Sequence, residues 1–344
     1  MGADITAGLL ACGFDRTDRV NVLIDLGTNG EMAVGNREKI MVTSTAAGPA
    51  FEGGNISCGM GSMPGAISRV EIRGGQTGIS VGKTGTSGGQ AGISVGKTGT
   101  SGGKTDASGE KTVCGFDGED VSARTDAGIE SRDIVCYTTG ERLSGDSSGK
   151  EKQSSCAEVR TGQGDIFCRT IGGRAPVGLC GTGVIETVYE LLKNEWIDET
   201  GLLDEAYFDD GFVLAASAAG GDIRFTQKDV REVQLAKSAV RAGLETLLLR
   251  YGVTYREIGT LYLAGGFGAR IDLKKAAGIG LLPEELLGKA AAVGNSALRG
   301  AAEFLRDEHA AARMEQIIQV SEEVQLAADK DFNRFYMEYM MFTV

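Results

Sequence analysis

The sequence predicts an α/β fold in which a mixed sheet is flanked by helices. Apolar runs of strand length lead into glycine-rich turns at residues 22–34 and 261–268, and stretches of helical period lie between them. Strands that are connected through helices build sheets with a parallel part and covered faces. A chain of 344 residues is long enough to bury a core of this kind.

The first of these elements, VLIDLGTNGEMAV at residues 22–34, is typical of a strand, a tight turn and a second strand. The turn glycines allow positive φ values, so that backbone N–H groups can converge on an anion. Asp25 stands where the first strand ends, and its carboxylate can hold a metal ion or a water of that ion. The turn is therefore a candidate site for a phosphate with its Mg²⁺, the alternative being an ordinary Asn-Gly hairpin. The candidate contacts in the turn are Gly27, Thr28, Asn29 and Gly30.

The second element is a loop of small residues, TSTAAGPAFEG at 43–53, in which Pro49 is placed to open a helix. A helix N-terminus offers free N–H donors and the positive end of the helix dipole to a phosphate. Gly48, directly before the proline, is therefore a candidate phosphate contact. Glu52 is a candidate for positioning a catalytic water or a metal ion, with the capping of a turn as the alternative.

The third element is the apolar strand and glycine turn LYLAGGFG at 261–268. Glycines at such a place let the backbone approach a flat ligand such as adenosine closely. Further along the chain, Asn295 begins a helix that is expected over residues 297–307, and it is a further candidate contact. The candidate contacts within the third element are Gly265, Gly266, Phe267 and Gly268.

Residues 74–166 are rich in glycine, serine, threonine and charge, and the segment GQTGISVGKTGTSG at 75–88 is repeated at 89–102 with one alanine in place of threonine. This composition does not bury enough apolar surface to offset the entropy of ordering, so we expect a mobile low-complexity insertion. The segment GISVGKT at 78–84 is one residue too short for a P-loop, and no apolar strand precedes it. It is not expected to bind phosphate.

The overall charge and the cysteines indicate a cytoplasmic protein. The net charge of −12 argues against nucleic acid or an anionic membrane surface as a partner. No apolar run reaches the length of a membrane span, and no signal peptide opens the chain. The seven cysteines form no CxxC pair and are expected to be reduced thiols.

Several segments, in order along the chain, resemble the reductive activators of corrinoid proteins: DLGTNGE, TAAGPAFEGGNISCGMG, PGAI, VGLCGTGVIETV, LAGGFG and VGNSALRGAAEFL. The resemblance covers roughly residues 1–73 and 170–344. It implies an ATPase domain of the ASKHA class (acetate and sugar kinases, Hsp70, actin), here divided into 1–73 and 167–344 by the insertion at 74–166. It also implies that ATP hydrolysis drives a low-potential electron from an N-terminal [2Fe-2S] domain onto a Co(II) corrinoid, which yields Co(I) for methyl transfer.

The same resemblance implies ATP and Mg²⁺ as ligands, with DLGTNGE as the second phosphate loop, LAGGFG as the adenosine loop and Asp25 as the metal contact. The [2Fe-2S] domain and the first phosphate loop of the family are expected to be absent, because Met1 aligns with the middle of the family sequence. The implied partners are a corrinoid iron-sulfur protein or a corrinoid methyltransferase protein and a second copy of the chain in a homodimer. The alternatives are a small-molecule kinase of the same superfamily and a catalytically silent fragment that only dimerises or docks.

Other residues receive a structural interpretation. The helix that starts at the capping box TQKD, residues 226–229, is expected to be scaffold. The matching helix of the family lies close to the nucleotide, so Glu232, Gln234 and Lys237 are secondary site candidates. His309 is interpreted as a solvated helix residue, and the aromatic residues at 332–342 as core or dimer contacts.

Overall fold

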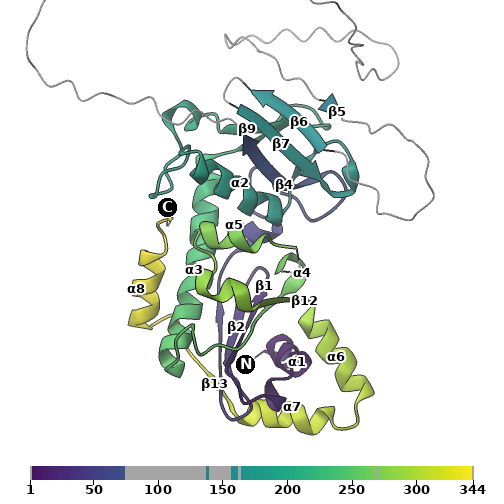
Figure 1. Ribbon diagram of the computed structural model, residues 1–344, viewed down its shortest axis with the longest axis vertical. Coiled ribbons are helices and arrows are strands. Elements are labelled where there is room, and N and C mark those ends of the chain that lie inside the picture. Colours follow the sequence, from purple (N-terminus) through teal and green to yellow (C-terminus); the bar gives the residue numbers. More distant parts are fainter. Residues whose placement is uncertain (1, 74–136, 139–155, 162–163, 269, 343–344) are drawn as a thin grey trace, which may run out of the picture. The chain divides into compact units, whose positions relative to one another are not determined.

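The computed structural model describes residues 2–73, 137–138, 156–161, 164–268 and 270–342 (Figure 1). Most of the segment predicted to be a low-complexity insertion, and with it the P-loop-like repeat, lies outside these described residues. Strand β6 and the first residues of β7 fall within the range 74–166, so an ordered sheet extends into its C-terminal end.

The main sheet has six strands in the order β12-β11-β1-β2-β3-β13. The strands β1, β2 and β3 form an antiparallel meander, whereas β11 runs parallel to β1 and β12 parallel to β11. The mixed sheet predicted from the hairpin and the crossover helices is therefore confirmed. The strands are β1 (Asn21–Leu26), β2 (Gly30–Gly35), β3 (Ile40–Thr45), β11 (Leu261–Ala264), β12 (Ala290–Gly294) and β13 (Ser321–Glu323).

A second sheet has the order β5-β6-β7-β4-β8, and a separate two-stranded sheet is formed by β9 and β10. Strand β4 pairs antiparallel with β7 from Ile67 to Arg73, with one register shift, but meets β8 at only two residues, so its other edge is largely open to side chains. The strands are β4 (Ala66–Arg73), β5 (Tyr137–Thr138), β6 (Cys156–Thr161), β7 (Gly164–Thr170), β8 (Gly178–Leu179), β9 (Phe212–Ala216) and β10 (Asp222–Phe225).

Helices cover both faces of the main sheet. The α-helices of the described residues are α1 (Ala3–Ala11), α2 (Gly181–Lys193), α3 (Gln227–Tyr251), α4 (Gly265–Gly268), α5 (Leu273–Gly278), α6 (Ser296–Arg306), α7 (Ala310–Gln319) and α8 (Lys330–Glu338), of which α2 packs on strand β4 of the second sheet. The predicted capping box is present at the start of α3, where the Thr226 side chain accepts from the backbone of Asp229, and Gly252 ends the helix in the left-handed conformation. Among the described residues, no helix is both long and apolar enough to cross a bilayer.

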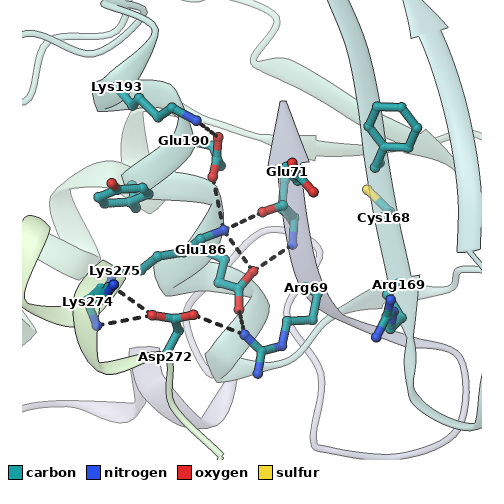
Figure 2. A pocket seen from close by; sticks show the side chains of 13 residues that line it. Arg69, Glu71, Cys168, Arg169, Glu186, Glu190, Lys193, Asp272, Lys274 and Lys275 are labelled. Carbon is teal, nitrogen blue, oxygen red and sulfur yellow. Dashed lines mark hydrogen bonds and ion pairs between the residues drawn. The ribbon is translucent and has the colours of Figure 1, made fainter. Parts of the chain in front are cut away.

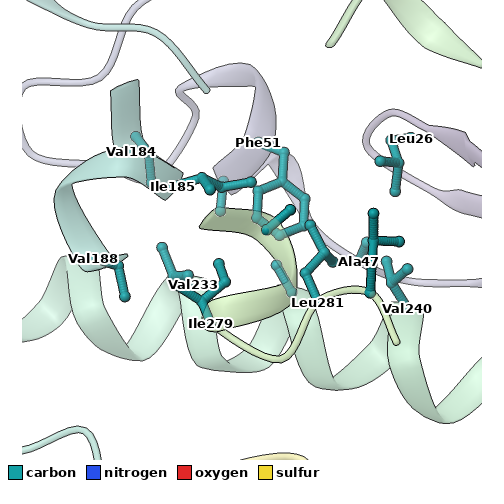
Figure 3. Close-up of a cluster of buried hydrophobic side chains, with 14 of the residues drawn as sticks. Leu26, Ala47, Phe51, Val184, Ile185, Val188, Val233, Val240, Ile279 and Leu281 are labelled. Atoms are coloured by element: carbon teal, nitrogen blue, oxygen red, sulfur yellow. The ribbon is translucent and has the colours of Figure 1, made fainter. Parts of the chain in front are cut away.

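The core reflects the two-residue period of the central strand. Val22 and Ile24 of β1 face the large apolar cluster that contains α2 and α3, whereas Leu23 faces a smaller cluster beneath α1 and α7. Figure 3 shows the large cluster, in which Phe51 packs among side chains of α2 and α3. Because β1 is buried on both faces, its end is held rigidly, and the turn that follows starts from a fixed position.

Candidate functional site

Asp25 and the glycine turn after β11 lie side by side at one edge of the main sheet. Asp25 is in register with Ala264 of the parallel strand β11, so the turn that begins at Gly265 starts directly beside it. Gly265 has φ +88°, and a Cβ built there would lie 2.6 Å from the Leu26 carbonyl oxygen and 2.9 Å from Asp25 Oδ1. Only glycine fits this backbone, because any other residue would be strained and would collide with the end of β1. The first and third predicted loops are thus brought together.

Glu52 joins this group from the second predicted loop. The Thr28 hydroxyl donates to Glu52 Oε2 at 2.5 Å, which ties the tip of the β1–β2 turn to the 3₁₀ helix η2 (Pro49–Glu52). The helix opens at Pro49 as predicted, but it has only four residues. A single turn carries little of the dipole on which the argument for phosphate binding at Gly48 rested.

The candidate residues of the turn differ in their surroundings. Thr28 and Asn29 are exposed, and the N–H of Gly27 donates within the turn to the Asn29 carbonyl at 3.3 Å. Gly30 is buried in β2, where a Cβ would lie 2.8 Å from Thr45 Oγ1 and 3.2 Å from Val240 Cγ2. Gly30 therefore serves the packing of α3 on the sheet, whereas the turn tip faces outward.

The remaining candidates lie around the same edge. Asn295 accepts from the Leu298 N–H at 2.8 Å and so caps α6, which leaves its amide nitrogen as the group available to a ligand. Gly266 is exposed, and a Cβ built there would meet nothing within 4 Å. Gly268 is buried, while the side chain of Phe267 lies outside the described residues.

Two carboxylates that the sequence analysis missed lie close to Asp25. Burial first, and then Asp4 in the first turn of α1, raises the pKa of Asp25, and the Ser296 hydroxyl opposes this shift. Glu31, which faces Asp25 across the β1–β2 pair, has its pKa raised by burial and by both aspartates. Glu31 could have been found from the register of the hairpin, whereas nothing local in the sequence connects Asp4 with Asp25. Within the described part of the chain, these residues do not form a preassembled metal site.

Burial and mutual repulsion thus both disfavour the ionised forms of Asp25 and Glu31. Their raised pKa values have the sign expected where negative charge lacks compensation. A nearby positive charge would lower the pKa of Asp25 again.

The structure places two of the α3 candidates away from this edge. Gln234 Nε2 donates to the carbonyls of Thr200 and Met340 at 3.0 and 2.7 Å. Lys237 Nζ donates to the carbonyls of Tyr339 and Met341 at 2.5 and 2.8 Å. These side chains hold the C-terminal segment on α3 instead of facing the Asp25 turn.

Lys237 is fully buried, and its ammonium group donates to backbone carbonyls. Burial, with a smaller effect of the nearby Arg241 guanidinium, lowers the pKa of Lys237 to about 7. Glu232, the third candidate on α3, accepts a bond of 3.3 Å from Asn55 Nδ2.

A charged cavity of ≈ 510 Å³ lies between α2, α5 and the second sheet (Figure 2). Glu186 accepts from the backbone N–H of Val70 at 2.9 Å and Glu190 from that of Ile72 at 3.3 Å, so two carboxylates one helical turn apart satisfy the open edge of β4. Lys275 bridges them at 3.1 and 3.0 Å. These contacts occupy most of the hydrogen-bonding capacity of the two carboxylates, which indicates a structural role in joining α2, β4 and α5.

Comparisons with known proteins agree on one group. The model of the family described as the C-terminal domain of RACo, the ASKHA domain, matches residues 19–115 and 153–344. The corrinoid activation enzyme RamQ of Eubacterium limosum is 31% identical over 361 residues, covering 99% of this chain and 46% of that protein. A [Co(II) methylated amine-specific corrinoid protein] reductase of Methanosarcina barkeri is 26% identical over 342 residues, covering 98% of this chain and 48% of that protein.

A solved structure of a reductive activator for a corrinoid, iron-sulfur protein matches with a TM-score of 0.69 and 27% identity. The match covers 99% of this chain and 42% of that chain. The chain thus spans about half the length of the relatives it matches.

Proposed function

Because this chain belongs to the family of the C-terminal domain of RACo, the ASKHA domain, we propose that it is the ATP-binding part of a reductive activator of corrinoid proteins. The relatives carry names that describe the activation or reduction of corrinoid proteins. The half of those relatives that this chain does not match is where we place the [2Fe-2S] electron donor and the first phosphate loop.

One observation carries the proposal for the site itself. The register of β1 with β11 sets Asp25 Oδ1 within 2.9 Å of the position that a Cβ of Gly265 would occupy. A carboxylate at a strand end and a glycine turn are thereby in contact although 240 residues separate them along the chain (265 − 25). In an open α/β sheet, ligands bind beside the carboxyl ends of the strands, which is where both groups lie.

Each group has a defined task in this proposal. Asp25 holds Mg²⁺ directly or through a water, the exposed tip at Thr28 and Asn29 faces the phosphates, and the open backbone at Gly266 receives the adenosine. Magnesium that is bound with ATP neutralises phosphate charge and polarises the phosphoryl oxygens. Glu52 fixes the turn tip through Thr28, and we assign to it the orientation of a water. A phosphate between Asp25 and these groups would be gripped from one side only.

We assign to the whole activator, beyond this chain, the transfer of a low-potential electron to Co(II) in a corrinoid iron-sulfur protein or a corrinoid methyltransferase protein. In such an activator the nucleotide acts by changing the conformation of the protein. Phosphate and metal hold two parts of the ATPase domain in a closed state, and hydrolysis releases them. A homodimer is part of the same proposal. Because this chain would contact the phosphates from one side only, we expect it to bind ATP weakly on its own and to hydrolyse it near the background rate.

The test is the substitution Asp25→Asn with a titration of Mg-ATP and, separately, of ADP without metal. Loss of a charge-assisted contact of about 1.5–3 kcal/mol weakens Mg-ATP binding by roughly ten- to hundredfold. Metal-free ADP is expected to bind almost as before. The matched control is Asp209→Asn, an exposed aspartate outside the site. Unchanged Mg-ATP affinity in a folded Asp25→Asn protein would remove the metal contact from the proposal.

A further inference from the structure

Helix α6 buries its small residues and exposes its large apolar ones. Ser296 and Gly300 are buried against α1, and a Cβ at Gly300 would collide with the Ala7 carbonyl oxygen. The two helices therefore meet at backbone distance. On the outer side, Leu298 is 67% exposed, Phe304 43% and Leu305 84%. A helix that supports only its own domain normally shows the opposite arrangement, with large apolar side chains inside.

The exposed side chains belong to one concave surface. A groove of ≈ 1060 Å³ runs along α1, α6 and α7, and Ile318 of α7 is 53% exposed within it. Contiguous apolar surfaces of this kind on a folded domain mark interaction sites, among them places where another polypeptide packs. The groove is lined mainly by Leu298, Ala301, Phe304, Leu305, Met314 and Ile318.

The groove also reaches the proposed nucleotide site. Asp4 and Asn295 line one part of it. Asp4 raises the pKa of Asp25, and Asn295 directly precedes Ser296, whose hydroxyl opposes that shift. A polypeptide that fills the groove would therefore end next to the Asp25 carboxylate. A cationic group on that polypeptide would compensate the charge of Asp4.

The relatives indicate which polypeptide occupies the groove. This chain covers 46%, 48% and 42% of the three relatives described above, and the matching family is a C-terminal domain. We propose that the groove formed by α1, α6 and α7 is the docking surface for a polypeptide equivalent to the part of those relatives that this chain does not match. The docking itself does not depend on nucleotide, whereas its consequence for Asp25 rests on the proposed function.

A second copy of this chain is the competing occupant. Two copies related by a two-fold axis would bring the same surface of each together, Asp4 included, and would add negative charge beside Asp25. A separate polypeptide with an apolar face and a cationic end has no such conflict. The acidic character of this part of the groove favours the separate polypeptide.

The experiment measures access to α6 without nucleotide. The part of E. limosum RamQ that this chain does not match is fused to the N-terminus of this chain, and Leu305→Cys is introduced in the fusion and in the chain alone. Alkylation at position 305 is followed by mass spectrometry, which separates it from the native cysteines. We expect at least a roughly tenfold slower reaction in the fusion, because covered positions react only after local opening. The matched control is Leu249→Cys on α3, an apolar position that is 50% exposed and outside the groove, and its rate should stay within about twofold.

Two measurements on other samples keep the proposal falsifiable if the fusion does not fold cooperatively. First, the unmatched part of RamQ is added as a separate chain, and the rate at position 305 is measured against its concentration. Second, sedimentation of this chain alone is compared with that of Leu305→Glu. The proposal expects the same oligomeric state in both, with unchanged thermal unfolding, because the isolated chain makes no contact through the groove.

Equal rates at position 305 in a folded fusion, or with the added chain, would overturn the proposal. A dimer of the chain alone that Leu305→Glu dissociates would also overturn it, by assigning the groove to a second copy. Because no nucleotide is present, loss of ATP binding in Asp25→Asn has no bearing on this result.

Discussion

Gly265→Ala tests the geometry on which the candidate site depends. The added methyl group would sit at φ +88°, 2.6 Å from the Leu26 carbonyl oxygen and 2.9 Å from Asp25 Oδ1. The left-handed conformation costs an alanine roughly 1–2 kcal/mol, and forcing extra atoms into a packed place costs about 1–3 kcal/mol. The free energy of unfolding should therefore fall by about 2–5 kcal/mol.

The same methyl group should disturb binding, because relief of the collision moves the end of β1 or the Asp25 carboxylate. We expect Mg-ATP affinity to fall by roughly tenfold or more, within the range of one charge-assisted contact. Urea unfolding gives the change in stability, and titration calorimetry gives the change in affinity.

The neighbouring residue provides the matched control. A Cβ at Gly266 meets nothing within 4 Å, so Gly266→Ala should change the stability by no more than about 1 kcal/mol. Gly266→Val should also stay folded, but it should weaken all adenine nucleotides, with or without metal, because its side chain fills the space assigned to the ring. If Gly265→Ala unfolds and binds like the wild type, the contact between β1 and the glycine turn does not shape the site.

Two further predictions concern the buried charges. The pKa of Lys237 is lowered to about 7 in the native chain, so between about pH 7 and 10 the unfolded chain binds a proton that the native chain does not. The stability of the wild type relative to Lys237→Met should therefore rise with pH, by at most about 1.4 kcal/mol per pH unit. A stability difference in urea unfolding that is flat or falls over this pH range would contradict the lowered pKa of Lys237. Glu186→Gln should lower the free energy of unfolding by about 2–3 kcal/mol, because Lys275 and the Val70 N–H lose a charged partner while Glu190 still pairs with Lys275. The exposed Glu71→Gln serves as its control and should change urea unfolding little, so equal effects of the two substitutions would show that burial of the pair is unimportant.

The sequence alone predicted the local features of the fold. The two apolar runs and the glycine turn between them predicted the β1–β2 hairpin, and the TQKD box predicted the start of α3, because both depend on residues a few positions apart. The motifs also led to the right family, since they are distributed along most of the chain. The proposal that Asp25, Thr28 and Gly266 contact a nucleotide stays a prediction, for which the structure supplies proximity.

The tertiary structure decided what depends on residues far apart in the chain. The register of β1 with β11 brings Gly265 against Asp25, and the return of the C-terminal segment to α3 turns Lys237 into a buried lysine that binds backbone carbonyls.

The sequence also did not show which face of α6 points outward. The sequence predicts a helix over residues 297–307, but the side that is buried is set by the close approach of α1 at Gly300. Local spacing fixes backbone conformation through short-range sterics and hydrogen bonds. Burial, pKa and the choice of partners depend on which distant surfaces meet, and that is settled only when the whole chain packs.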